Sequence, residues 1–501
     1  MASISHGSRG AIAAGDPRAA VAGMLAYGMG GNAIDAALSA AVTQWVVMPD
    51  MCGPGGDCLA LVGKQGKVIA LNASGPPPKS AFGHRNPLQI SSTVPAALQG
   101  MEAVHRIGGE LPLHAVFGHA VQLARQGFTV SGSLAWQFKN VEKTPFGKEL
   151  ASNITGPIRE CELVSWPNMA DTLESIAEKG SGAFGSGKLG ETMLSEWSER
   201  GVSFQPDDLT DIGPEPTEPL AADYEGWHLW AQPPVSQGAI ILLALEILGR
   251  EGREELGEAT ERGIHLGIEA IKSAMEIGSQ SIYDGSSDTL RSLIASGKLK
   301  KQRISPLASA GPSIMAGYGE TTHVATADKD GWMVSLLHSL YLPFGAKVMS
   351  PSTGVILNNR GLCFDMEGPN SPEPGRRPRH TLSNLMMESP EGQRIALGTP
   401  GANAQVQTIL QIALGLMTAP EREWSSVLDR PRWGFWGGKH VAVEDRVPRA
   451  VMAALSERGH SLVSRQSWDP LTGAVGVAIA SSGVGTTAIQ DRRREGISLA
   501  I

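Results

Sequence analysis

The sequence predicts a layered α/β protein in which two central sheets are covered by helices. Three observations favour this class. The chain has 501 residues with 42% hydrophobic content, which is enough to bury a large core. Its 61 glycines and 32 prolines indicate many tight turns between ordered elements. Alternating apolar patterns typical of strands occur in the first and last thirds, whereas helical patterns fill the middle.

The first predicted elements are two helices within residues 16–47, where apolar residues recur three and four positions apart. Gly30 and Gly31 separate them, because glycine permits the left-handed conformation that ends a helix. Asn32 is expected to cap the second helix, and Asp35 adds negative charge to its first turn. The letters GMGGNA at this turn also match the dinucleotide-binding pattern G-x-G-x-x-A, but that motif requires a preceding strand. We therefore interpret the stretch as a turn between helices, with a nucleotide-linked oxidoreductase as the alternative.

Strand and helix patterns then follow in order along the chain. Residues 51–62 turn through the glycine loop GPGGD into a strand, residues 66–74 form the next strand, and residues 76–87 form a loop. GPGGD either brings its backbone close to a ligand or simply turns a corner. Helical patterns dominate from about Pro95 to Ala274 and cover residues 96–109, 113–127, 169–180, 238–249 and 264–278.

Strands return in the last third of the chain. Residues 322–340 are predicted to form a hairpin, because DKDG is strong turn chemistry between two alternating runs. Residues 394–401 form a strand that ends in a glycine loop, a helix follows over 404–417, and residues 473–491 form a final hairpin. Because strands and helices interleave, we expect one interwoven unit.

Charge and composition exclude several classes of function. The formal net charge is -8 and the longest basic cluster is DRRRE near the C-terminus, so no nucleic-acid partner is expected. The N-terminus lacks the apolar core of a secretory signal, and no window has the roughly 18 uninterrupted apolar residues of a membrane span. We therefore expect a cytoplasmic protein without membrane contact.

The cysteines and histidines indicate neither disulfides nor a metal. Cys52 and Cys58 could approach as a pair, but reduced core thiols are predicted, because four scattered cysteines make no disulfide framework. His323, His338 and His380 are expected to make structural or substrate contacts, since no histidine shows a metal-ligand spacing such as H-E-x-x-H. No metal and no organic cofactor are expected.

The most informative stretch is GYGETTHVATADKDG, where two threonines stand directly before a strand. Thr-Thr at a strand start is ordinary β propensity. It also suits a nucleophile, provided that a base lies beside the hydroxyl. An N-terminal threonine supplies its own base, because an α-amine has a pKa of about 7.7 to 8.0. Thr321 would gain that amine if its hydroxyl attacked the Glu320 carbonyl and water opened the ester, and Gly319 would tolerate the strained backbone.

Several longer motifs resemble the gamma-glutamyltranspeptidase family of N-terminal nucleophile (Ntn) hydrolases. GGNAIDAALSAAV, GPGGD, VPAALQGMEAV, GGELPL and AVQLARQGF are similar to its large subunit. TTHVATADKDGWMVSL, LPFGAKVMSPSTGVILNN, GTPGA, PRW and DRRREG are similar to its small subunit, and the matches keep their order almost end to end. The resemblance implies a four-layer αββα sandwich with a helical large-subunit region. It also implies one precursor that is cleaved into a large subunit, residues 1–320, and a small subunit, residues 321–501.

The resemblance further implies catalytic roles. Thr321 would attack an amide carbonyl to form an acyl-enzyme, and its own amine would carry the proton. Ser339 stands where the family has a threonine that hydrogen-bonds the nucleophile. The backbone N–H groups of Gly401 and Ala402 in GTPGA match the family's Gly-Gly oxyanion hole. Loss of one such donor would cost about 3 kcal/mol of barrier.

Three departures from the family concern substrate binding. Where the family has an arginine that holds the α-carboxylate of a glutamyl group, this chain reads LNASGPPP, with alanine or serine at that place. Cys363 stands at the place of the aspartate that binds the α-amine, with Asp365 two residues later. His380 and Thr381 replace the paired serines of the carboxylate pocket. Because a charged amino-acid head group needs buried partners at both ends, glutamyl recognition is not expected.

Other residues indicate what binds instead. Arg360 stands where the family commonly has glutamine, and arginine suits a bidentate grip on a carboxylate. The motifs NNRG, which contains Asn359, and PRW resemble the branch that includes oxamate amidohydrolase-like proteins. The alternative role for Arg360 and its neighbours is a surface ion pair or loop packing. The predicted contacts for a small polar or carboxylate-bearing amide are Arg360, Tyr341, His380, Thr381 and Asn359.

Together these expectations predict a self-processing Ntn amidohydrolase that hydrolyses a small non-γ-glutamyl amide. One alternative is a γ-glutamyl hydrolase or transpeptidase with an altered pocket. Another is an uncleaved family member with a binding role or a divergent catalytic role. Large and small subunits would come from one precursor, and whether two such pairs form a dimer stays open.

Overall fold

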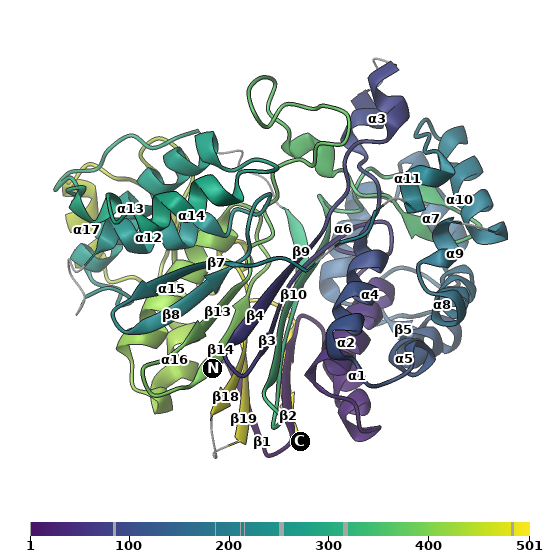
Figure 1. Ribbon diagram of the computed structural model, residues 1–501, viewed down its shortest axis with the longest axis horizontal. Helices are drawn as coiled ribbons and strands as arrows, with labels where there is room; N and C mark the ends of the chain where they lie inside the picture. Colours follow the sequence, from purple (N-terminus) through teal and green to yellow (C-terminus); the bar gives the residue numbers. More distant parts are fainter. Residues whose placement is uncertain are drawn as a thin grey trace.

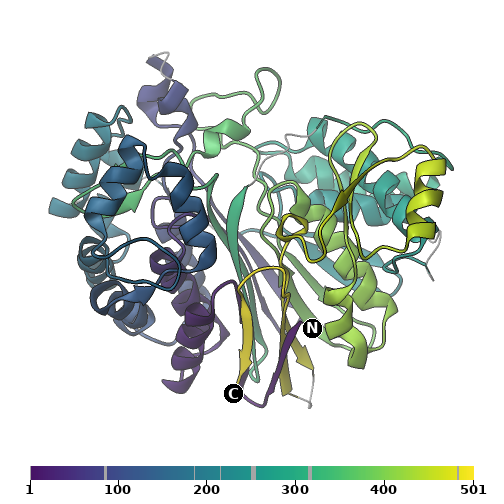
Figure 2. The same cartoon turned by 180° about the vertical axis from the view of Figure 1, so that it is seen from behind.

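The computed structural model shows a layered αββα sandwich. It describes residues 2–83, 87–185, 187–210, 212–214, 216–249, 255–313, 319–481 and 485–501. Two sheets pack face to face in the centre, and a layer of helices covers the outer face of each (Figure 1). From behind, the same layers are visible, and both chain ends lie on the sheets (Figure 2). The predicted fold class is confirmed.

The sheet that carries the predicted nucleophile has the strand order β20-β2-β9-β10-β3-β4. Every neighbouring pair is antiparallel, and β9 and β10 form its centre. The hairpin predicted from DKDG is therefore confirmed. The strands are β2 (Gly10–Ala14), β3 (Asp57–Lys64), β4 (Lys67–Ala73), β9 (Glu320–Asp328), β10 (Trp332–Tyr341) and β20 (Ile497–Ala500).

The facing sheet has the order β1-β19-β18-β14-β13-β8-β7, again antiparallel throughout. Its strands are β1 (Ser3–Gly7), β7 (Leu220–Tyr224), β8 (Trp227–Ala231), β13 (Leu385–Glu388), β14 (Arg394–Gly398), β18 (Gly476–Ser481) and β19 (Gly485–Gln490). The smaller sheets contain β5 (Phe128–Thr129), β6 (Leu163–Val164), β11 (Met349–Ser350), β12 (Val355–Ile356), β15 (Trp433–Phe435), β16 (His440–Glu444) and β17 (Ser461–Arg465).

Small side chains fill the space between the two large sheets. Because side chains alternate along a strand, every second residue of β2, β9, β14 and β18 points to this interface. Most of these residues are alanine, which lets the sheets approach closely. The cluster consists of Ala11, Ala13, Leu61, Ala70, Ala325, Ala327, Met333, Met386, Ala396, Ala478, Ala480 and Ala488.

One helical layer packs on the sheet of β9 and β10, and the other packs on the facing sheet (Figure 1). The first contains α1 (Pro17–Gly28), α2 (Ala33–Val47), α4 (Ala97–Gly108), α5 (Leu113–Gln126), α6 (Gly132–Val141), α7 (Pro145–Asn153), α8 (Pro167–Lys179), α9 (Gly182–Gly185), α10 (Lys188–Glu199) and α11 (Pro206–Thr210). The second contains α12 (Ala239–Leu248), α13 (Glu261–Ser281), α14 (Ser287–Ala295), α15 (Ala404–Thr418), α16 (Trp424–Asp429) and α17 (Arg449–Glu457). The short helix α3 (Pro87–Ser91) lies at the end of the first layer.

Local chemistry explains the turn between α1 and α2. The Asn32 side chain accepts hydrogen bonds from the N–H groups of Ile34 and Asp35, and Asp35 accepts one from the Asn32 N–H. A helix, not a strand, precedes the GMGGNA motif. The predicted helix-to-helix turn is therefore confirmed, and the motif lacks the strand that dinucleotide binding requires.

The middle of the chain, predicted to be mainly helical, also contains the strands β5, β6, β7 and β8, which the sequence patterns did not predict. The β7 sequence, LAADY, contains residues that favour helix, and its strand conformation comes from pairing with β8, which in turn pairs with β13. Parts of two predicted elements, residues 84–86 of the first loop and 482–484 of the final hairpin, lie outside the described residues. Two residues of the GYGETT stretch, 317 and 318, lie outside them as well.

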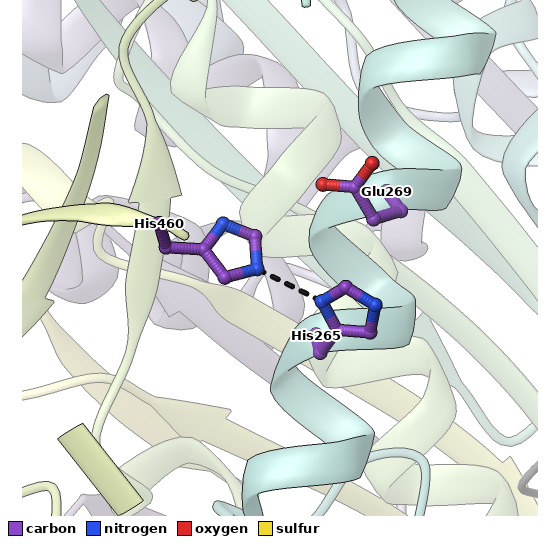
Figure 3. A group of neighbouring side chains, drawn as sticks. All are labelled: His265, Glu269 and His460. Carbon is purple, nitrogen blue, oxygen red and sulfur yellow. Dashed lines mark hydrogen bonds between the residues drawn. The ribbon is translucent and has the colours of Figure 1, made fainter. Parts of the chain in front are cut away.

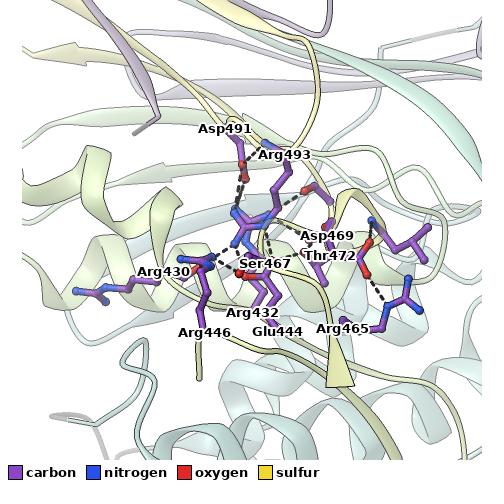
Figure 4. Close-up of polar contacts among 12 residues, drawn as sticks. Arg430, Arg432, Glu444, Arg446, Arg465, Ser467, Asp469, Thr472, Asp491 and Arg493 are labelled. Carbon is purple, nitrogen blue, oxygen red and sulfur yellow. Dashed lines mark hydrogen bonds and ion pairs between the residues drawn. The ribbon is translucent and has the colours of Figure 1, made fainter. Parts of the chain in front are cut away.

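Two motifs from the sequence, PRW and DRRREG, meet in one buried ion network (Figure 4). Arg432 pairs with Asp491, while Arg493 pairs with Glu444 at 2.7 Å and with Asp491 at 3.2 Å. A buried charge is tolerated when it is paired and hydrogen-bonded, as these are. The network fixes the C-terminal segment and so holds the next residue, Arg494, close to the start of β9.

Two sequence expectations concern cysteines and membranes. Cys52 and Cys58 are buried free thiols, as predicted, whereas Cys161 is exposed and Cys363 half-buried. Within the described part of the chain, no helix is both long and apolar enough to span a membrane.

Candidate active site

Thr321 lies near the start of β9 and is only 2% exposed. Its Oγ1 donates a hydrogen bond to Ser339 Oγ at 3.2 Å, and Ser339 Oγ donates one to the Glu320 carbonyl at 2.7 Å. One serine hydroxyl therefore links the predicted nucleophile to the carbonyl of the preceding peptide bond. A hydrogen bond to a carbonyl oxygen stabilises the negative charge that develops there during attack.

A β-bulge places Ser339. The pairing of β10 with β9 shifts register between His338 and Tyr341, and Tyr341 has a φ of 80°. A left-handed backbone is uncommon outside glycine and often marks a functional position. The bulge lets the Tyr341 N–H donate to Ser339 Oγ at 2.8 Å. The hydroxyl thus accepts two hydrogen bonds and donates one, which fixes its position.

The predicted oxyanion hole lies where β14 connects to α15. Gly401 and Ala402 have φ values of 130° and 48°, and neither backbone N–H donates to another described residue. Gly319 packs directly against this turn, because a Cβ on Gly319 would lie 2.5 Å from Ala402 Cβ. The chain that leads into Thr321 therefore runs beside the two free N–H groups.

The glycine loop GPGGD packs behind Ser339. A Cβ on Gly56 would lie 2.5 Å from the Ser339 carbonyl oxygen, and one on Gly55 would lie 2.0 Å from the Ile356 carbonyl oxygen. No larger residue fits at either position without a backbone shift. The loop needs its glycines because it must approach strand β10 closely, and it ends at Asp57.

Asp57 takes part in the candidate site, although no role was predicted for it from the sequence. Its buried carboxylate accepts hydrogen bonds from Arg360 Nε and from His380 Nε2, both at 3.0 Å. Burial, followed by the charge of Arg360, lowers the pKa of His380 to about 4, so this imidazole is neutral with its proton on Nε2. An aspartate directly after GPGG at a strand start was the available signal, because a buried carboxylate requires such partners.

Arg360 is fully buried, so the alternative of a surface ion pair is wrong. Its guanidinium carbon lies 4.5 Å from the centroid of the Tyr341 ring, a cation–π contact. Nη1 donates to Thr381 Oγ1 at 3.3 Å. Nη2 has no hydrogen-bond partner among the described residues.

A cavity of about 280 Å³ opens beside these side chains. Tyr341 and Thr381 line it, together with Asn403, which follows the predicted oxyanion hole. Asp365 and Arg379, paired at 2.9 Å, also reach its wall. The remaining lining is mainly apolar and includes Ile240, Met275, Ile282, Leu362 and Phe364.

Three predicted contacts do not line this cavity. Asn359 Oδ1 accepts a hydrogen bond from the Leu342 N–H at 3.1 Å and so fixes the turn after β10. Arg360 and His380 are bound to Asp57 and support Tyr341 and Thr381 from behind. The structure therefore brings the predicted residues together as one cluster, with only Tyr341 and Thr381 of the five in the cavity wall.

His323 and His338 are core residues. His323 Nε2 contacts Ser335 Oγ at 2.9 Å, and His338 Nδ1 accepts from Trp45 Nε1 at 3.1 Å. Burial lowers the pKa of each to about 3, so both are neutral at physiological pH. Of the structural and substrate contacts that were predicted for these two histidines, the structure shows the structural ones.

The residue before Thr321 is held from two directions. Gln137 Nε2 donates to Glu320 Oε1, and Arg494 Nη1 donates to Glu320 Oε2, both at 2.9 Å. Burial, and then the nearby Glu320 carboxylate, raises the pKa of Asp50 to about 7. Asp50 Oδ2 has no partner among the described residues.

Asp50→Asn is expected to flatten the fall of stability between about pH 4 and pH 7. Because the pKa of Asp50 is raised in the folded state, its favourable contribution is complete below pH 4 and is lost as the pH rises towards 7. In the wild type, this effect lowers the free energy of unfolding by about 4 kcal/mol, since one pKa unit corresponds to about 1.4 kcal/mol. Thermal melts from pH 4 to 8 measure this. The surface variant Asp171→Asn should follow the wild type, and parallel curves for all three proteins would contradict the prediction.

Comparison with known proteins shows that the chain is similar to the members of one family. The family model for gamma-glutamyltranspeptidase matches residues 19–501. The glutathione hydrolase-like YwrD proenzyme of Bacillus subtilis is 29% identical over 484 residues, which cover 91% of each chain. The oxamate amidohydrolase proenzyme of Klebsiella pneumoniae is 28% identical over 489 residues, 90% of each chain. The crystal structure of cephalosporin acylase from Bacillus halodurans superposes with a TM-score of 0.88 at 30% identity, over 99% of this chain and 97% of that one.

The αββα sandwich and these structural matches define the class as an Ntn hydrolase. The chain belongs to the gamma-glutamyltranspeptidase family. It is accordingly an enzyme that acts on C–N amide bonds, and the family resemblance predicted from the sequence is confirmed.

Proposed function

We propose that this chain is the precursor of an amidohydrolase that cleaves its own Glu320–Thr321 bond and then hydrolyses a small amide. The observation that carries the proposal is the Ser339 hydroxyl, which accepts from Thr321 Oγ1 and donates to the Glu320 carbonyl. This bridge orients the nucleophile and polarises its target together. The proenzyme names of the relatives from B. subtilis and K. pneumoniae support a precursor that is cleaved. A cut before Thr321 would give residues 1–320 and 321–501.

The proposed cleavage is an acyl shift followed by hydrolysis. Thr321 Oγ1 attacks the Glu320 carbonyl carbon, its proton reaches the Thr321 nitrogen, and the C–N bond breaks to leave an ester and a free amine. A cavity of about 20 Å³ lies against Thr321, with room for one water molecule. Attack by water on the ester gives the Glu320 carboxylate and restores the threonine hydroxyl.

In the mature enzyme the new amine acts as the base. It takes the proton of the Thr321 hydroxyl as the oxygen attacks the substrate carbonyl, and returns that proton to the leaving amine. The N–H groups of Gly401 and Ala402 stabilise the oxyanion, with about 3 kcal/mol of barrier resting on each donor. Water then hydrolyses the acyl-enzyme.

The cavity supports a substrate without a free amino-acid head group. Asp365, the carboxylate in the cavity lining, is paired with Arg379, so it is not free to bind an α-ammonium group. Arg360 Nη2 has no hydrogen-bond partner among the described residues, but the guanidinium is fully buried behind Tyr341 and does not line the cavity. Its positive charge next to the wall formed by Tyr341 and Thr381 favours a carboxylate or carbonyl oxygen of the substrate there. A second candidate, γ-glutamyl hydrolysis, is favoured by the name of the B. subtilis relative.

A panel of amides separates these two candidates. The wild-type enzyme is assayed with oxamate, with an anilide whose acyl chain ends in a carboxylate, with an uncharged acyl anilide and with a γ-glutamyl anilide. We expect kcat/KM for a carboxylate-bearing amide to exceed that for the γ-glutamyl anilide at least tenfold. Arg360→Lys should reduce this preference, whereas Arg200→Lys, whose arginine pairs with Glu149 outside the cavity lining, serves as the control. Highest turnover of the γ-glutamyl anilide would instead establish the second candidate.

Gly319→Ala is expected to slow self-cleavage at least tenfold. The added Cβ would meet Ala402 Cβ at 2.5 Å and displace the scissile segment from Ser339 and the oxyanion hole. Denaturing gels after expression measure the cleaved fraction over time. Gly28→Ala is the control, because nothing lies within 4 Å of a Cβ there. The double variant Gly319→Ala with Ala402→Gly should recover cleavage, and normal cleavage of the single variant would refute the proposed packing.

A further inference from the structure

A polar cluster outside the catalytic region joins two helical-layer segments. His265 and Glu269 stand one turn apart on α13, and His460 lies just before β17 (Figure 3). The three side chains point toward one another, and one ligand atom from each lies within 4.8 Å of those from the others. The residues are 2%, 4% and 4% exposed.

Hydrogen bonds fix the protonation of His265. Its Nε2 contacts the Ser305 carbonyl at 2.8 Å, and a carbonyl can only accept, so Nε2 carries the proton. Nδ1 therefore has a free lone pair, which faces His460 Nε2 at 2.9 Å. A backbone carbonyl on the far ring nitrogen is the usual support of a metal-ligating histidine.

We propose that His265 Nδ1, His460 Nε2 and the Glu269 carboxylate bind one divalent zinc-type cation. Imidazole and carboxylate are ligands that Zn²⁺ takes, in a set of three that leaves a fourth position for water. Two tetrahedral ligands at about 2.0 Å from the metal stand about 3.3 Å apart, so the two imidazoles need to separate only slightly. The His460 proton moves from Nε2 to Nδ1, which has no partner among the described residues.

Lys272 competes with the cation for the same carboxylate. Its Nζ donates to Glu269 Oε1 at 2.7 Å and to the Ser309 carbonyl at 2.9 Å. Glu269 Oε2 accepts from the Ser309 N–H at 3.1 Å. Oε2 also accepts a hydrogen bond from the Ser309 hydroxyl, so Oε1 is the carboxylate oxygen that keeps a free lone pair. Glu269 can therefore bind the metal through Oε1 and keep these hydrogen bonds. The ammonium nearby lowers the affinity, and we expect micromolar rather than nanomolar binding.

The metal would join α13, which carries His265 and Glu269, to His460 just before β17. Hydrogen bonds of His265 and Glu269 hold Ser305 and Ser309, which precede the proposed cleavage site, against the same helix. If the chain is cleaved before Thr321, as proposed above, two ligands belong to the large fragment and one to the small fragment. The bound cation then cross-links the two products.

Metal titration of the whole, untagged protein tests this site. The wild type is stripped with a chelator, desalted, and titrated with Co²⁺ by visible absorption and with Zn²⁺ by competition. We expect one equivalent to bind with a tetrahedral cobalt spectrum and to raise the melting temperature. His460→Gln should raise the dissociation constant of the metal at least tenfold. His440→Gln, an exposed histidine in the same part of the chain, should leave it unchanged.

The wild-type measurement alone can overturn the proposal. A stripped wild-type protein that takes up no stoichiometric Co²⁺ or Zn²⁺ contradicts it, as does equal binding by wild type and His460→Gln. Glu269→Gln provides a second ligand variant should His460→Gln fold poorly. The uncleaved variant Thr321→Ala should bind the metal as tightly as the wild type. This result separates the metal site from the proposed self-cleavage.

Discussion

Thr321→Ala is expected to yield one uncleaved polypeptide of 501 residues with no measurable amidase activity. The substitution removes the only atom that attacks in the proposed mechanism, and the bond that would free the amine stays closed. Loss of a covalent nucleophile that acts with its base as a unit lowers kcat by about 10⁶. A denaturing gel and an amide assay on the same preparation measure both effects.

The neighbouring threonine supplies the matched control. Thr322 is as buried as Thr321, and its Oγ1 has no hydrogen-bond partner among the described residues. Thr322→Ala should therefore be cleaved and active. Thr321→Ser keeps a hydroxyl within reach of Ser339 and should be cleaved slowly. Cleavage of Thr321→Ala at the same bond would remove Thr321 from the mechanism.

Asp57→Ala should destabilise the protein by about 3 to 5 kcal/mol, because it leaves the buried Arg360 without its carboxylate. His380 loses the acceptor for its Nε2 proton at the same time. Unfolding is best followed in the Thr321→Ala background, where the chain stays in one piece. The melting temperature then reports the loss without a change in cleavage.

A double variant separates two effects of Asp57→Ala on stability, namely the loss of the ion pair with Arg360 and the loss of side-chain volume. Asp57→Leu with Arg360→Met removes both charges and should be more stable than either single variant. Asp365→Asn, in the half-exposed pair with Arg379, should cost less than about 1 kcal/mol. If Asp57→Ala leaves the melting temperature of the Thr321→Ala protein unchanged, the buried pair does not hold Tyr341 and Thr381 in place.

The elements with strong local signals were predictable. The capped helix at Asn32 and the DKDG hairpin follow from residue chemistry that acts within a few positions. β7 could not be recognised in this way, since its sequence favours helix and its pairing partner β8 alone makes it a strand. The family resemblance supplied the four-layer αββα architecture, which local patterns do not encode, whereas the strand order of the two sheets is known only from the structure.

The candidate site could be predicted in part, for the same reason. Thr321, Ser339 and Tyr341 lie on one hairpin, so their proximity follows from local pairing. Asp57 meets Arg360 across 303 positions of sequence, and only the fold shows that the two are partners. The proposed metal ligands could not be predicted from the sequence either, since His265 and His460 are 195 positions apart and no short motif contains them.

The central claim is that the active enzyme begins a chain at Thr321. N-terminal sequencing and intact-mass measurement of the wild-type enzyme, taken from a preparation that turns over an amide, test it most directly. We predict two fragments, the smaller of which begins TTHVATAD. A single unbroken chain that still hydrolyses the amide would contradict the account, because Thr321 would then have no α-amine to act as its base.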